Sequence, residues 1–147
     1  MSAFERHSMS LMSVRACQDV SAVLHSGVLY KQGRVVRNWK LRYMTLTPES
    51  LTYYSSEGGE LKGTVDVRYC MPSHLEIVPP SVVDFGASKW RLAIQTPSRR
   101  LVVAAPSEHA MHAWAFALLT LFKSNEGRFV QQGVVPVAPR GRRSSIV

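Results

Sequence analysis

The sequence lacks the features that mark a membrane-spanning or exported chain. No apolar run approaches the ~20 residues that a helix needs to cross a bilayer. The first 25 residues hold no continuous apolar stretch between a basic start and a cleavage site. Arg6, Arg15 and several serines weakly resemble a transit peptide, but Glu5 and Asp19 argue against one. These absences predict a soluble chain.

Cysteine is scarce, and catalytic motifs are missing. Only Cys17 and Cys70 are present, far apart and without a CxxC pair, which favours free thiols in a reducing, intracellular setting. His109 and His112 lie three residues apart but have no third ligand in view, so no metal site is expected. The sequence shows no Ser-His-Asp set and no Gly-rich phosphate loop. We therefore expect neither an enzyme nor a bound cofactor.

Positive charge, in contrast, is abundant. The 147 residues carry a formal net charge of +8 with a pI near 10.0, which favours a negatively charged partner such as nucleic acid or an anionic membrane. Hydrophobic residues make up 46% of the chain and charged residues 19%, so the middle of the chain should fold. The length allows one domain with a single hydrophobic core.

From Gly27 onward, short runs of β-branched, aromatic and alternating residues are separated by turn formers every eight to twelve positions. This pattern is typical of a small all-β sandwich or barrel. Each break contains Gly or Pro with polar neighbours, the residues that set turn geometry or end a strand. The seven predicted strands cover residues 28–31, 39–47, 51–55, 63–67, 74–78, 89–96 and 99–105.

After Pro106 the apolar period changes to that of a helix. Ser107 can cap the helix start, and Glu108 suits the positive end of the helix dipole. A predicted apolar stripe, with Trp114 as its main anchor, faces the core, and the helix should end near residues 123–127. The stripe consists of Met111, Trp114, Ala115, Leu118, Leu121 and Phe122.

The two ends of the chain differ in composition from its middle. Residues 1–23 are rich in Ser and Met, and the apolar residues of 11–24 fit a helical face only loosely, so we expect a flexible or marginally helical segment. Residues 127–147 contain prolines, glycines and arginines, which predicts a disordered basic tail. The tail's Ser145 two residues before Val147, preceded by paired arginines, also suggests a phosphorylation site or a terminus captured by a protein partner.

Residues 31–42 are the most informative segment. They contain five cations and no acid, yet they span one predicted strand, a turn and a second strand. Lys40 and Arg42 are two apart and share a face, so a hairpin would bring Lys31, Lys40 and Arg42 onto one anion, with Leu41 and Tyr43 facing the core. A solvated hairpin without a partner is the alternative. The uncompensated positive potential favours an anion.

This chain resembles a known family over about residues 24–126. Seven short strands in two sheets, followed by one C-terminal helix bearing a tryptophan, resemble a pleckstrin-homology (PH) domain, which implies a mainly β fold: a seven-stranded antiparallel sandwich or barrel capped by one helix. The family's phosphoinositide-binding signature, a Lys late in strand one and then Lys/Arg-x-Arg in strand two, is matched by Lys31, Lys40 and Arg42. Their spacing, with Gly33 and Trp39 between them, is similar to that in protein kinase B and the cytohesin-type exchange factors.

The resemblance implies further ligands for an inositol phosphate headgroup. Tyr53 matches a phosphate-contacting tyrosine of strand three, Asn38 a polar loop residue, and Lys62 a basic residue just before strand four. Arg34 and Arg37 belong to the loop and would face the membrane or the headgroup. The chain departs from cytohesin-type domains in having only a short turn, rather than a long insertion, between strands six and seven.

The expected function is therefore a phosphoinositide-binding adaptor module, cytoplasmic and recruited peripherally to anionic membranes, with its headgroup pocket between strands one, two and three. A protein-binding module on the same fold, with only weak, nonspecific membrane binding, is the alternative. Nucleic acid is disfavoured because Trp39 is the only aromatic residue in the basic segment, whereas single-strand binders interleave several stacking aromatics.

Overall fold

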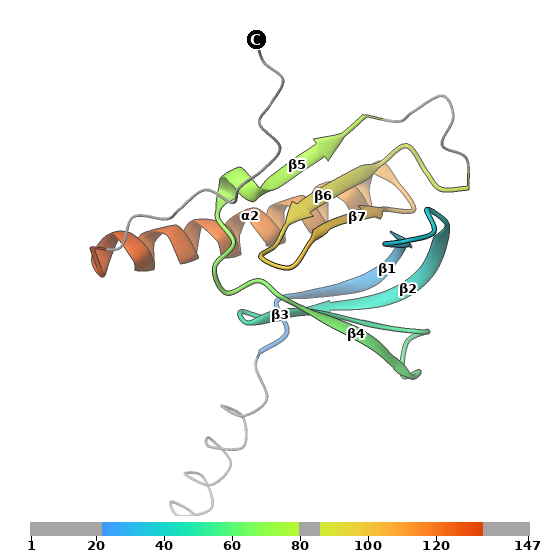
Figure 1. Ribbon diagram of the computed structural model, residues 1–147, viewed down its shortest axis with the longest axis horizontal. Coiled ribbons are helices and arrows are strands. Elements are labelled where there is room, and N and C mark those ends of the chain that lie inside the picture. Colours follow the sequence, from blue (N-terminus) through green and yellow to red (C-terminus); the bar gives the residue numbers. More distant parts are fainter. Residues whose placement is uncertain (1–21, 80–85, 134–147) are drawn as a thin grey trace, which may run out of the picture.

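The computed structural model describes residues 22–79 and 86–133, and within these ranges all seven predicted strands and the C-terminal helix are present (Figure 1). No strand end differs from its predicted position by more than three residues. Most of segment 1–23, part of the loop before the sixth strand and most of the tail lie outside the described residues. The elements are β1 (His25–Gln32), β2 (Trp39–Leu46), β3 (Ser50–Tyr54), β4 (Leu61–Asp66), the 3-10 turn η1 (Pro72–His74), β5 (Leu75–Val78), β6 (Arg91–Gln95), β7 (Arg100–Ala104) and α2 (Glu108–Gln131).

The described strands form one antiparallel sheet in the order β4-β3-β2-β1-β7-β6-β5. β1 pairs along its whole length with β2, but with β7 only through Tyr30↔Ala104 and Lys31↔Val103. This short junction divides the sheet into two parts, β1–β4 and β5–β7, which appear as two layers in Figure 1. The predicted antiparallel fold with one capping helix is confirmed; the two predicted sheets are one continuous sheet with two parts.

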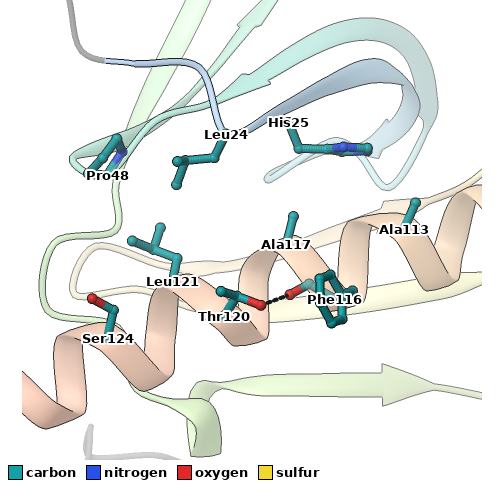
Figure 2. A pocket seen from close by; sticks show the side chains of 9 residues that line it. All are labelled: Leu24, His25, Pro48, Ala113, Phe116, Ala117, Thr120, Leu121 and Ser124. Atoms are coloured by element: carbon teal, nitrogen blue, oxygen red, sulfur yellow. Dashed lines mark hydrogen bonds between the residues drawn. The ribbon is translucent and has the colours of Figure 1, made fainter.

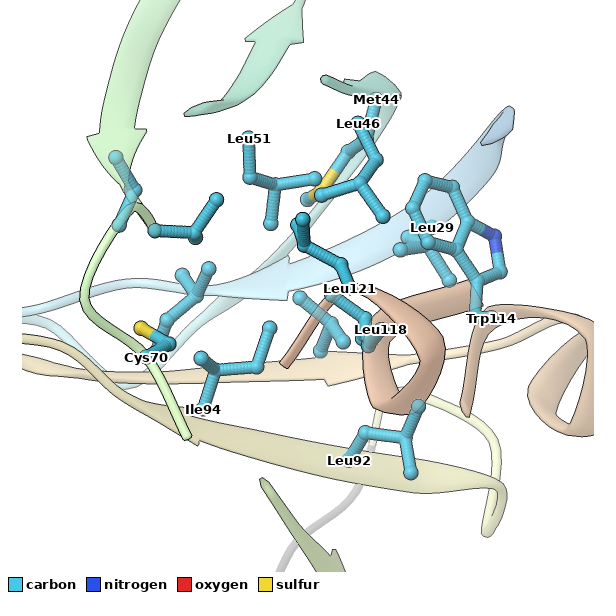
Figure 3. Close-up of a cluster of buried hydrophobic side chains, with 14 of the residues drawn as sticks. Leu29, Met44, Leu46, Leu51, Cys70, Leu92, Ile94, Trp114, Leu118 and Leu121 are labelled. Atoms are coloured by element: carbon cyan, nitrogen blue, oxygen red, sulfur yellow. The ribbon is translucent and has the colours of Figure 1, made fainter. Parts of the chain in front are cut away.

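Both parts of the sheet and the helix contribute to one hydrophobic core (Figure 3). Leu29, Met44 and Leu51 come from β1–β3, whereas Leu92 and Ile94 come from β6. All five are at most 1% exposed, so each contributes about 1.5–3 kcal/mol of favourable burial. In β1–β4, residues of the opposite parity remain partly or fully exposed, which is the alternation that the sequence pattern predicts.

The helix begins as predicted. The Ser107 side chain accepts a hydrogen bond from the Ala110 N–H at 3.1 Å, and Glu108 lies in the first turn. Trp114 is only 2% exposed; its indole ring lies edge-on to His25, with ring centroids 4.5 Å apart. A Cβ added to Gly27 would stand 3.5 Å from the indole Nε1, so the tryptophan packs directly over the β1 backbone.

The end predicted for the helix, near residues 123–127, is wrong. α2 continues to Gln131, and the glycine with positive φ that follows it is Gly133 rather than Gly127. Asn125, which lies within this predicted end, is buried, and its Nδ2 donates to the carbonyls of Val67 and Cys70 at 3.1 and 2.9 Å. Because tertiary carbonyls satisfy this amide, it ties α2 to the chain after β4 and does not interrupt the helix.

No helix in the described ranges combines the length and apolar content needed to cross a bilayer. The same ranges contain no group of three His, Cys, Asp or Glu side chains placed to hold a metal ion. Cys70 is a buried free thiol, and burial raises its pKa to about 12.

Candidate functional site

The β1–β2 hairpin places its cations as the sequence predicts. Lys31 lies directly opposite Lys40, and Leu29 opposite Arg42, so the three cations share one face of the hairpin. The loop is closed by two backbone hydrogen bonds of 2.8 Å, from the Gly33 N–H to the Asn38 carbonyl and from the Asn38 N–H to the Val36 carbonyl. A side chain at Gly33 would collide with the Val36 carbonyl, so this loop requires glycine.

The face that carries the cations is the inner face of the sheet, which corrects the predicted placement of Leu41 and Tyr43. Arg42 follows the same alternation as the fully buried Met44, whereas Leu41 is 50% exposed and Tyr43 is only half-buried. The reason is that β2 extends past the core: its inner face buries apolar side chains at one end and presents Lys40 and Arg42 at the open end.

Tyr53 continues this inner face on β3. Its ring lies 4.9 Å from the Lys31 Nζ, a cation–π distance, and its edge meets Gly63 on β4, where any side chain would collide with the phenol. The β3–β4 register shifts here: Tyr53 pairs with Gly63 but Tyr54 pairs with Leu61. Lys62 is the extra residue of this bulge, and its side chain lines the same cavity.

These side chains surround a cavity of about 230 Å³ at the open end of β1–β4. Six of the eight predicted site residues line it, together with Gly33: Lys31, Asn38, Lys40, Arg42, Tyr53 and Lys62. The geometry thus brings together four cations with two uncharged hydrogen-bonding groups. One carboxylate lies near, since Lys62 Nζ and Glu60 Oε2 are 3.5 Å apart, but both side chains are substantially exposed, so this pair restrains Lys62 only weakly.

The crowding of positive charge is strongest at Lys31. Burial, followed by the charges of Arg99, Arg42 and Lys40, lowers the pKa of its ammonium group to about 8. An anion bound beside Lys31 would offset the repulsion from these neighbouring cations and stabilise the charged ammonium group. The arrangement is therefore suited to bind a multiply charged phosphate compound.

Arg99 is a member of the site that the sequence reasoning missed. It lies in the β6–β7 turn, where its carbonyl accepts a hydrogen bond from the Thr96 N–H at 2.9 Å. Its Nη2 donates to the Tyr53 hydroxyl at 3.2 Å, across 46 residues of chain. The short turn therefore supplies a cation at the cavity edge, although it has no room for an insertion.

Arg34 and Arg37 are the two predicted residues that the structure separates from the others. Both are exposed on the β1–β2 loop and line a neighbouring cavity of about 380 Å³ together with Arg99 and Arg100. Arg100 is already paired with Glu76, with Nη2 and Oε2 3.2 Å apart. Gly33 lines both cavities, and Arg99 lines this second cavity while its side chain bonds to Tyr53 of the first, so basic side chains lie on both sides of the hairpin tip.

The hairpin tip also presents apolar side chains between its cations. Val35 is 91% exposed and Val36 is 67% exposed, with Arg34 and Arg37 on either side. Two adjacent β-branched residues left in water at a loop tip contribute nothing to the core. Flanking cations next to exposed apolar groups are a pattern that suits contact with a bilayer surface.

Comparison with known proteins decides the family. Residues 23–121, more than half of the chain, match the family model described as PH domain. The chain belongs to the PH domain family. The match covers all seven strands and more than half of α2, and thus includes every residue of the cavity described above.

The relatives are pleckstrin-like. The chain is 30% identical to human pleckstrin-2 over 110 residues, covering 75% of this chain and 31% of that protein. It is also 30% identical over 122 residues to the mouse protein "Differentially expressed in FDCP 6", covering 80% of this chain and 18% of that protein. The chain therefore spans less than a third of the length of these curated relatives.

Solved structures support the fold. The C-terminal PH domain of human pleckstrin is similar to this chain with a TM-score of 0.59 and 22% identity, covering 72% of this chain and 92% of that domain. The C-terminal PH domain of pleckstrin has also been solved in complex with D-myo-Ins(1,2,3,5,6)P5. That structure has a TM-score of 0.56 and 25% identity, covering 69% of this chain and 96% of that one.

Proposed function

We propose that this PH domain is a non-enzymatic membrane-recruitment module that binds the inositol phosphate headgroup of a phosphoinositide between β1, β2 and β3. The observation that carries the proposal is the convergence of Lys31, Lys40 and Arg42 on one small cavity beside Tyr53. Lys31 and Lys40 stand directly opposite each other, an arrangement that is destabilising unless an anion lies between them. The pleckstrin PH domain in complex with an inositol pentakisphosphate shows that a protein of this family accepts such a ligand.

The headgroup contacts follow from the chemistry of each side chain. Arg42 offers a planar fork that suits two phosphate oxygens, and Lys31 and Lys40 offer point charges from the opposite strand. Asn38 and Tyr53 add uncharged hydrogen bonds, and Lys62 approaches from the bulge. In this proposal the signature residues act as in the protein kinase B and cytohesin type, while Arg99 replaces ligands that a β6–β7 insertion would supply.

Lipid selectivity tests the proposal. Several cations on one cavity favour bis- and trisphosphorylated lipids over monophosphorylated ones, with discrimination among the polyphosphorylated lipids limited to about tenfold, or ~1.4 kcal/mol. Liposomes carrying each phosphoinositide are compared in sedimentation with phosphatidylserine liposomes of matched surface charge and with phosphatidylcholine liposomes. If affinity follows total charge alone, the headgroup pocket is wrong, and the chain is a protein-binding PH domain with nonspecific attraction to anionic membranes.

Headgroup affinity is expected to fall as pH rises from 7 to 9. A bound phosphate holds the Lys31 ammonium in its charged form, so above its unliganded pKa of about 8 binding must first take up a proton. The phosphate charge changes little over this range, because a phosphate monoester with a second pKa of about 6 is already about nine-tenths ionised at pH 7. The loss should reach about tenfold at pH 9, one unit above the pKa of Lys31.

Titration calorimetry with a soluble inositol phosphate at constant ionic strength measures this profile. The matched control is Lys31→Arg, whose guanidinium stays charged throughout the range and should give a flat profile. Parallel profiles for the wild type and this variant would show that another group controls the pH dependence.

Val35→Asp is expected to weaken binding to phosphoinositide liposomes at least fivefold while leaving binding to the soluble headgroup within twofold. Val35 is 91% exposed and does not line the cavity, so the substitution removes only apolar contact with the bilayer and adds repulsion from anionic lipid. Paired measurements on liposomes and on the free inositol phosphate separate the two effects. A Val35→Thr variant provides a control of similar shape, and equal losses in both assays would mean that the loop itself has been distorted.

A further inference from the structure

An apolar groove lies between the start of β1, the β2–β3 turn and the side of α2 that faces them (Figure 2). Leu24, His25 and Pro48 form one wall, and the helix forms the other. The cavity volume is about 540 Å³, larger than either basic cavity. It is lined by Leu24, His25, Pro48, Ala113, Phe116, Ala117, Thr120, Leu121 and Ser124.

The lining of the groove is poorly suited to bind an anion. None of its lining side chains carries a formal charge at neutral pH, because burial lowers the pKa of His25 below its ordinary value. The Thr120 hydroxyl is already used, since it donates to the Phe116 carbonyl at 2.7 Å. Phe116 remains 75% exposed and Leu24 46% exposed at its rim. Its chemistry therefore selects apolar side chains, in contrast to the phosphate-binding cavity at the other end of β1.

Apolar residues directly precede the groove in the sequence. The Leu24 N–H donates to the Leu46 carbonyl at 2.8 Å, which anchors the chain beside the groove, and residues 1–21 precede this point. In the sequence, Met9, Met12, Ala16 and Val20 recur at three- and four-residue spacing. Val20 is only four residues from Leu24, so it lies within about 14 Å of the groove wall whatever path the chain takes.

We propose that residues 9–20 of this chain cover the groove, with Met12, Ala16 and Val20 against Phe116, Ala117 and Leu121. A tethered segment meets the groove at an effective concentration in the millimolar range, so it outcompetes a free partner of similar apolar content. The wall from Ala113 to Ser124 is about 16 Å long, the length of about three helical turns. The proposal is independent of the headgroup site, which lies at the opposite end of β1.

Disulfide trapping in the full chain tests the proposal, because Cys17 is a native thiol within the covering segment. Thr120→Cys places a partner thiol in the groove, and Glu126→Cys places one at an exposed position of the same helix that lies about 120° away around the helix axis. Cys70 does not compete, since it is buried and its pKa of about 12 keeps it protonated. Both variants are oxidised with glutathione disulfide, and intramolecular crosslinks are quantified by peptide mass mapping.

The expected result is that the crosslink to Cys17 forms at least tenfold faster in the Thr120→Cys variant than in the Glu126→Cys variant. Adding Met12→Ser and Val20→Ser to the Thr120→Cys variant should remove this advantage. Equal rates at the two positions, or no crosslink at either, would overturn the proposal. Crosslinks between molecules, with a yield that rises with protein concentration, would overturn it as well, and would assign the groove to a second copy of this chain.

Discussion

Trp114→Ala is expected to lower the free energy of unfolding by about 3–5 kcal/mol, the largest stability effect of any prediction made for this domain. The indole is 2% exposed, packs over Gly27 and meets His25 edge-on, so truncation leaves a cavity between α2 and the β1 backbone. Small domains have only about 5–15 kcal/mol of total stability, so a large part of it would be lost. Urea denaturation followed by circular dichroism measures the difference.

Val130→Ala is the matched control for this prediction, because Val130 lies on the same helix but is 69% exposed. Its effect should stay within about 0.5 kcal/mol. If the two variants had similar stability, α2 would not be anchored through Trp114. Any loss of lipid binding in Trp114→Ala should appear only under conditions in which the variant is partly unfolded, because the indole lies outside the headgroup cavity.

Arg42→Ala is expected to weaken headgroup binding by roughly 10- to 100-fold while leaving the fold intact. Charge-assisted hydrogen bonds contribute about 1.5–3 kcal/mol each, and Arg42 is the cavity residue best shaped for a two-point phosphate contact. Among the residues that the structure describes, its guanidinium donates only to the neighbouring Leu41 carbonyl at 3.0 Å, so little stability depends on it. Binding is measured by calorimetry with a soluble inositol phosphate and by liposome sedimentation.

Two comparisons sharpen the test of Arg42. Lys123→Ala removes the same amount of charge from an exposed position on α2, away from the cavity, and should change the affinity less than twofold. Arg42→Lys keeps the charge but loses the planar fork, so it should fall between the wild type and Arg42→Ala. Equal weakening by Arg42→Ala and Lys123→Ala would indicate attraction to net charge without a pocket.

Much of the site could be predicted because its main residues are close in sequence. Lys31, Lys40 and Arg42 belong to one hairpin, so the two-residue period of the strands and a single turn decide that they share a face. The prediction that Leu41 faces the core was wrong for a related reason. Alternation says which residues share a face, but only the position of the core says which face is inside.

Other members of the site depend on contacts that no local pattern encodes. Arg99 reaches Tyr53 across 46 residues, and this meeting requires the β5–β7 part of the sheet to turn back toward β3. Lys62 was expected from the family resemblance, but its orientation results from a bulge between β3 and β4. The position of Arg34 and Arg37 in a separate cavity likewise follows from how the loop folds beside β7.

The amino-acid sequence by itself determined the elements of this protein, the turns between them, the capped start of α2 and the cationic face of the hairpin. Each of these follows from periodicity and backbone chemistry within a few residues. The tertiary structure alone decided where α2 ends and which face of β2 is buried. It also decided that Arg99 reaches Tyr53 at the cavity edge, and that an apolar groove without charged side chains lies beside α2. The physical reason is that burial and long-range hydrogen bonds, such as those of Asn125 to Val67 and Cys70, exist only once distant segments are packed together.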